Sequence, residues 1–222
     1  MLRNKGERCW TFCSGVLVLV VLAALIGAWV LPNAWGDENG PLELTQAFVL
    51  LCASIIALSA RFFGVGTLAM RKLIVWTIPI WLIMCGRELS WGRVFYLTQE
   101  GNMPQLSDLS YGRYVTLAIA ITIIITLWGL FRSGLVYQVR RWIKYGTLPI
   151  VEIIIMLVTG FLAAWVEHYS GGVFGAREEL YEELAEWVCY SAAFFIMLDV
   201  GFNKKIQPSQ EGRIKSKSVM PL

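Results

Sequence analysis

The stretch LIVWTIPIWLIM (residues 73–84) is followed directly by CGRELSWGR (residues 85–93). The first segment has no charged residue, whereas the second brings two arginines and a glutamate together within seven positions. Charge at the end of a membrane helix is costly unless it is paired or hydrated. On a continuous helix Arg87 and Trp91 share one face, and Glu88 lies beside Arg87. We therefore expect a polar centre at the end of this helix, with Arg87, Glu88, Trp91 and Arg93 as its residues.

The composition of the whole chain indicates an integral membrane protein. Its 222 residues are 57% hydrophobic and only 16% charged, with a mean hydropathy of +0.60, whereas soluble domains carry about 25% charged residues. Six apolar segments are long enough to cross about 30 Å of hydrocarbon. They are residues 11–31, 45–63, 73–92, 114–132, 148–166 and 184–202. The sequence thus predicts an all-α, six-helix transmembrane bundle over residues 1–202, followed by a basic and disordered tail at 203–222.

Charged residues are distributed unequally between the two ends of these helices. The tails and the even-numbered loops hold 15 lysines and arginines, whereas the odd-numbered loops hold 4. By the positive-inside rule both termini are therefore expected in the cytoplasm. Twelve of the sixteen acidic residues lie in the outer loops or at the outer helix ends. This acidic outer face either keeps the loops solvated or forms a site for a cation or a basic partner.

Three glutamates outside the motif are expected to approach Arg87 and Glu88. Glu43 follows Pro41, which suits a first helical turn, and a carboxylate there complements the helix dipole. Glu183 and Glu186 belong to a glutamate-rich segment that we expect to be helical from residue 177 and to continue into the last span. Arg87, Glu88, Trp91, Arg93, Glu43, Glu183 and Glu186 are therefore the candidate ligand- or partner-binding residues.

Two further acids lie at the cytoplasmic ends of spans five and six. Glu152 and Asp199 are each about one turn from a helix end. They are expected either to pair with the nearby basic loops or to form a second polar site.

The remaining reactive side chains favour neither catalysis nor a metal centre. The chain has one histidine, His168, and no nucleophile–base set, so no catalytic residue, metal site or cofactor is predicted. A disulfide between Cys85 and Cys189 requires their two helices to touch. The basic segment at 140–144 is too short to indicate nucleic-acid binding and instead predicts a short amphipathic helix at the membrane surface.

Three segments together carry a resemblance to a known family. They are Glu38-Asn39-Gly40-Pro41-Leu42-Glu43, Arg87-Glu88-Leu89-Ser90-Trp91-Gly92-Arg93 and the glutamate-rich entry to the last span. The chain resembles an uncharacterised family of small bacterial polytopic inner-membrane proteins with an [ER]-E-x-S-W-G-[QR] motif. The resemblance implies a multi-pass protein of the bacterial cytoplasmic membrane and cell envelope, without implying a reaction.

Three functions are compatible with this sequence. The first is an envelope protein that binds a lipid or a protein partner, or a second copy of this chain, through the outer polar site. The second is a small transporter or channel for a cation or small solute. The third is a membrane enzyme acting on an outer-leaflet lipid or glycan, with paired carboxylates as acid and base. In a fourth interpretation the Arg87–Glu88 cluster only holds three helices together.

Overall fold

Every regular element among the described residues (10–96, 103–145, 148–204 and 206) of the computed structural model is helical. Six helical segments are long and apolar enough to cross a membrane, which confirms a multi-pass, all-helical membrane protein. They comprise α1 (Phe12–Val30), α2 (Pro41–Phe63), α3 (Leu68–Val75) with α4 (Ile78–Glu88), α5 (Gly112–Arg132), α7 (Ile150–Tyr169) and α8 (Glu178–Phe202). The predicted disordered tail lies almost entirely outside the described residues.

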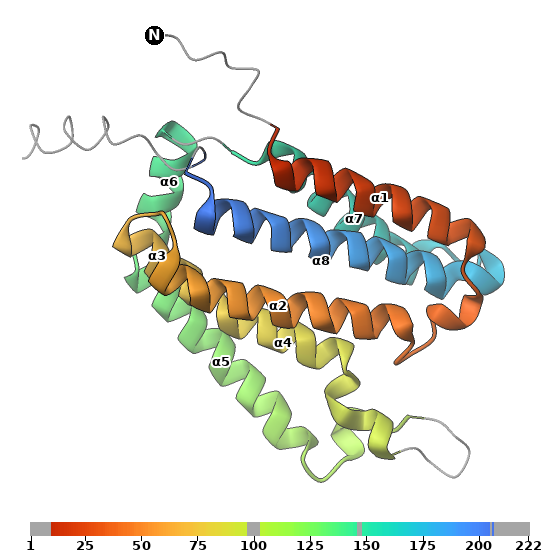
Figure 1. Cartoon of the computed structure of the whole chain (residues 1–222). Coiled ribbons are helices and arrows are strands. Elements are labelled where there is room, and N and C mark those ends of the chain that lie inside the picture. The colour runs from red at the N-terminus through yellow and green to blue at the C-terminus, as the bar shows by residue number, and fades with distance from the viewer. Residues whose placement is uncertain (1–9, 97–102, 146–147, 205, 207–222) are drawn as a thin grey trace, which may run out of the picture.

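Helix α8 is the centre of the bundle, with α1 and α7 on one side and α2 on the other (Figure 1). Helix α4 packs against α2, and α5 lies beyond α4. The α2–α8 contact uses small residues, because Ala57 and Ala60 are completely buried in a cluster with Met197 and Val200 of α8. In membranes small residues let helix backbones approach closely. This contact brings the acidic ends of α2 and α8 together.

Local sequence explains why α2 and α8 begin before their apolar segments. Helix α2 begins at Pro41 with Glu43 in its first turn, where the fixed φ of proline and a negative charge both favour a helix start. Helix α8 has Glu178 and Glu179 in its first turn and continues without a break to Phe202. The expectation of one continuous helix from residue 177 into the last span is therefore correct to within one residue.

The third span is interrupted. Helix α3 ends at Val75 and α4 begins at Ile78, with Pro79 in the first turn of α4. Proline is accepted there because the first-turn amides have no intrahelical partner, so the predicted kink is a break between two helices. Helix α4 then ends at Glu88, not at residue 92. The prediction that Arg87 and Trp91 lie one turn apart on a helix is therefore wrong.

Short elements complete the fold. Helix α6 (Leu135–Tyr145) is the expected amphipathic segment, and its Trp142 donates to the Ile206 carbonyl. The remaining elements are 3-10 turns: η2 (Asn33–Trp35), η3 (Ser90–Tyr96), η4 (Leu106–Asp108) and η5 (Gly175–Arg177). Turn η5 connects α7 to α8 at the end of the bundle that the charge distribution assigns to the outside. We call this end the predicted outer end.

Candidate functional site

Three of the predicted glutamates meet at the predicted outer end. Glu43 comes from the start of α2, Glu88 from the end of α4 and Glu183 from α8. One carboxylate oxygen from each lies within 4.8 Å of the others. Glu88 is nearly inaccessible, with 3% of its surface exposed. We call these three residues the carboxylate cluster.

An arginine and a fourth glutamate border the carboxylate cluster. The Nε of Arg87 lies 3.1 Å from Glu88 Oε1, and its Nη2 donates to both carboxylate oxygens of Glu186. Tyr190 donates its hydroxyl to Glu88 Oε1 at 3.0 Å. The Arg87 guanidinium thus pairs with two carboxylates, those of Glu88 and Glu186, and its side chain is 58% exposed. The cluster has an excess of negative charge that a bound cation can neutralise.

The chain turns sharply directly after Glu88. Ser90 and Trp91 have left-handed backbone conformations, with φ of 48° and 52°, and Gly92 follows at 78°. A bulky residue rarely adopts this conformation, and residues held in it occur preferentially at functional sites. The turn folds the Trp91 ring back onto Gly86, where any added Cβ would lie 2.5 Å from a ring atom.

Two predicted site residues lie outside the carboxylate cluster because of this turn. Trp91 packs on Gly86 and is not at the polar centre. Arg93 donates to the Ser90 carbonyl at 3.2 Å and approaches Glu38 at 3.8 Å. Both residues therefore contribute to the turn, and the predicted continuous helix would have placed them differently.

The second pair of predicted acids also comes together, at the opposite end of the bundle. Glu152 of α7 is completely buried and Asp199 of α8 nearly so. Thr11 donates to Asp199 at 2.7 Å, and Ser14 donates to Glu152. Asn203 also donates to Asp199 at 3.0 Å. These acids form a second polar site with hydrogen bonds from hydroxyl and amide groups and from the Cys13 thiol.

The possible disulfide is absent from the structure. Cys85 and Cys189 are both free. The Sγ of Cys85 contacts the Ala47 carbonyl, whereas the Sγ of Cys189 contacts the Met156 carbonyl. The two thiols therefore belong to different helix contacts.

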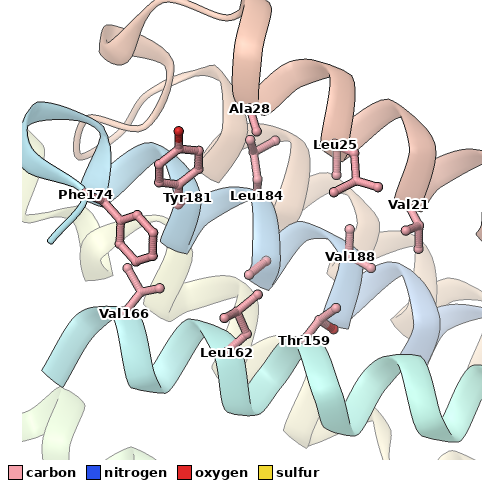
Figure 2. A pocket seen from close by; sticks show the side chains of 12 residues that line it. Val21, Leu25, Ala28, Thr159, Leu162, Val166, Phe174, Tyr181, Leu184 and Val188 are labelled. Atoms are coloured by element: carbon pink, nitrogen blue, oxygen red, sulfur yellow. The ribbon is translucent and has the colours of Figure 1, made fainter. Parts of the chain in front are cut away.

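An apolar groove that the sequence analysis missed lies between α1 and α7, with α8 as its floor (Figure 2). Its volume is about 250 Å³, and its lining is almost wholly apolar. The lining residues are Val21, Ala24, Leu25, Ala28, Thr159, Leu162, Val166, Phe174, Tyr181, Leu184, Ala185 and Val188. All except Phe174, which lies in the α7–α8 connection, belong to the halves of the three helices nearest the predicted outer end. The available sequence signal is the set of alanines on α1 and α8, which leaves space between bulkier walls.

A second, acidic pocket, lined by glutamates, lies where α7 ends and α8 begins. Its volume is about 490 Å³, and it is lined by Glu167, Gly175, Ala176, Glu178, Glu179 and Glu182. Val166, Phe174 and Tyr181 line the groove (Figure 2). Each immediately precedes a residue of the acidic pocket in the sequence. The groove and the acidic pocket are thus lined by neighbouring residues of α7, of α8 and of the connection between them.

A single arginine lies beside the mouth of the groove. Arg177 donates from Nη1 to the carbonyl of Ala28 at 2.8 Å, and Ala28 itself lines the groove. Among the described residues, Glu178, Glu179 and Glu182 have no ion-pair partner. Arg177 thus places one positive group beside the groove, whereas the three glutamates of the acidic pocket have no ion-pair partner among the described residues.

The groove and the carboxylate cluster lie on opposite faces of α8. With about 3.6 residues per turn, Tyr181, Leu184 and Val188 share one face, whereas Glu183, Glu186 and Tyr190 share the other.

Comparisons with protein-family models, curated proteins and solved structures found no match. Both sites are therefore interpreted from their own chemistry.

Proposed function

We propose that this chain is a multi-pass protein of the bacterial cytoplasmic membrane, with both termini inside, that binds one amine-bearing phospholipid at its outer end. The observation that carries the proposal is the apolar groove with Arg177 beside it, together with an acidic pocket whose lining residues follow those of the groove in the sequence. An acyl chain suits the groove, because the almost wholly apolar lining of the groove matches the apolar surface of the chain. Phosphatidylethanolamine has the matching head group, a phosphate next to a protonated amine.

The charges at the mouth favour this head group over an anionic one. Arg177 can donate to a phosphate, for which the guanidinium fork is well suited. The ammonium group can then lie beside Glu178 and Glu182. An anionic lipid such as phosphatidylglycerol offers the phosphate alone, so it leaves the acidic pocket without a positive partner.

Native mass spectrometry of the protein in detergent with added phosphatidylethanolamine tests the groove. Ala28→Phe places a ring in the groove but keeps the backbone carbonyl that Arg177 contacts. The matched control is Ala164→Phe, at an exposed position of α7 outside the groove lining. We expect Ala28→Phe to reduce the lipid adduct about tenfold, a difference of about 1.4 kcal/mol. An equal effect of both substitutions would contradict the proposal.

A second pair of variants tests the head-group pocket. Glu178→Gln combined with Glu182→Gln should abolish the preference for phosphatidylethanolamine over phosphatidylglycerol, while a lipid adduct remains. Asp37→Asn, an exposed carboxylate outside the pocket, is the matched control and should keep the preference. Unchanged selectivity in the double variant would show that the pocket does not recognise the amine.

A further inference from the structure

The carboxylate cluster lies on the other face of α8 from the groove and is not used by the proposed lipid. We infer that Glu43, Glu88, Glu183 and Gln46 form a binding site for one hard divalent cation the size of calcium. The site is independent of lipid binding. Its evidence is the geometry of the three carboxylates together with an unpartnered buried amide oxygen.

Gln46 is the observation that separates this cluster from an ordinary acidic patch. Its side chain is completely buried. Its Nε2 donates to the carboxylate of Glu183 at 2.7 Å and to the Glu183 carbonyl at 2.8 Å. These two bonds fix the amide against the cluster and identify the nitrogen. The remaining atom, Oε1, is buried and has no hydrogen-bond partner among the described residues. A buried carbonyl oxygen without a donor is uncommon, and a cation would supply its partner.

Each glutamate of the cluster keeps one oxygen available. Glu43 Oε2 accepts from the Asn39 amide, Glu183 Oε2 accepts from Gln46, and Glu88 Oε1 accepts from Arg87 and Tyr190. The other oxygen of each has no hydrogen bond from a described residue. The protein thus orients each of the three carboxylates through one oxygen and leaves the other oxygen free. Hydrogen bonds to neighbouring groups typically orient metal ligands in this way.

The spacing of the carboxylates fits a calcium-sized ion. Two ligands of one Ca²⁺ at about 2.4 Å are at most about 4.8 Å apart, whereas Mg²⁺ demands near-ideal octahedral geometry and gives up its waters reluctantly. The three carboxylate oxygens lie within 4.8 Å of one another. Calcium also prefers carboxylate and amide oxygens and tolerates irregular geometry. Glu186, paired with Arg87, adds negative charge beside the site without being one of its ligands.

Calcium titration of the full chain in detergent, after treatment with EDTA, tests this inference. Isothermal calorimetry should show one Ca²⁺ site with weaker Mg²⁺ binding. Terbium(III), which replaces calcium and emits when a nearby aromatic ring is excited, should luminesce through Tyr190 and be displaced by Ca²⁺. Glu43→Gln and Glu183→Gln should each raise the Ca²⁺ dissociation constant at least about tenfold.

Glu38→Gln is the matched control. Glu38 lies in the α1–α2 connection, shortly before Glu43, and is not a member of the cluster. It should bind Ca²⁺ like the unchanged protein. Absence of binding at about 10 mM Ca²⁺, ten times the weakest range of extracellular calcium modules, would overturn the inference. An equal loss of Ca²⁺ affinity in Glu38→Gln and Glu43→Gln, or tighter binding of Mg²⁺ than of Ca²⁺, would also overturn the inference.

Discussion

Replacing Glu183 with glutamine should have opposite effects on stability with and without calcium. The change removes one negative charge and keeps an oxygen that can accept from Gln46. In EDTA it relieves repulsion with Glu43 and Glu88, whose oxygens lie within 4.8 Å. With calcium present it removes a ligand. The variant is therefore expected to have a higher melting temperature than the unchanged protein in EDTA. Calcium should raise its melting temperature by less.

The magnitude of this effect follows from the spacing of the carboxylates. Two unit charges at 4.8 Å, the upper limit of these separations, repel by about 3.5 kcal/mol at an effective dielectric constant of about 20. Glu183 takes part in two such pairs, and the Arg87 guanidinium offsets part of the repulsion. A net increase of only about 1 kcal/mol in the free energy of unfolding raises the melting temperature of a chain of this size by about 2–4 °C. Calcium at one hundred times its dissociation constant stabilises the unchanged protein by about 2.7 kcal/mol.

Tryptophan fluorescence during heating in detergent provides the assay, because the chain has ten tryptophans. Glu38→Gln is again the control, since the Glu38 side chain is 62% exposed. It should change the melting temperature little in either buffer. A lower melting temperature of Glu183→Gln in EDTA, or an equal calcium response in both proteins, would refute this reasoning.

Two further predictions concern the supports of the two polar sites. Gly86→Ala should lower the free energy of unfolding by about 1–3 kcal/mol, because the new methyl group must displace the Trp91 ring. Gly15→Ala, whose nearest neighbour lies at 4.0 Å, should instead stabilise α1 by about 0.5–1 kcal/mol; equal effects in thermal unfolding would argue against the tight contact. Thr11→Val removes the hydroxyl that donates to buried Asp199 and should lower the free energy of unfolding by about 1–3 kcal/mol. An unchanged melting temperature in that variant would show that Asp199 does not depend on Thr11.

The positions of the membrane helices follow largely from the sequence. An apolar run of about 20 residues needs a helix to satisfy its backbone in lipid, so the six spans are predictable from composition alone. Their ends depend on local chemistry, as Pro41 and the first-turn glutamates of α8 show. The interruption at Trp76–Thr77 is less predictable, since a proline inside an apolar segment is compatible with either a kink or a new helix start.

The carboxylate cluster was only partly predictable. Acidic residues at the outer ends of α2, α4 and α8 suggested that Glu43, Glu88 and Glu183 would meet, and their oxygens do lie close together. The position of Trp91 could not be inferred, because its left-handed backbone conformation is unusual for a bulky residue. Gln46 was overlooked because a glutamine in an apolar helix carries no charge signal.

The groove depends on how three helices are arranged, which periodicity alone does not specify. Helices α1 and α7 both pack on α8 and have little contact with each other. Whether Ala28 and Ala185 face a space or a neighbouring side chain depends on the positions of these helices. One histidine likewise argued against a metal centre, but calcium sites are built from oxygen ligands and need no histidine.

The most direct test of the account is a competition between two lipids for the unchanged protein. Native mass spectrometry in equimolar phosphatidylethanolamine and phosphatidylglycerol, with matched acyl chains, measures the ratio of the two adducts. The charges around the groove mouth predict one bound lipid and a ratio of about ten in favour of phosphatidylethanolamine, equivalent to about 1.4 kcal/mol. A ratio near one, or a preference for phosphatidylglycerol, would contradict the proposed function.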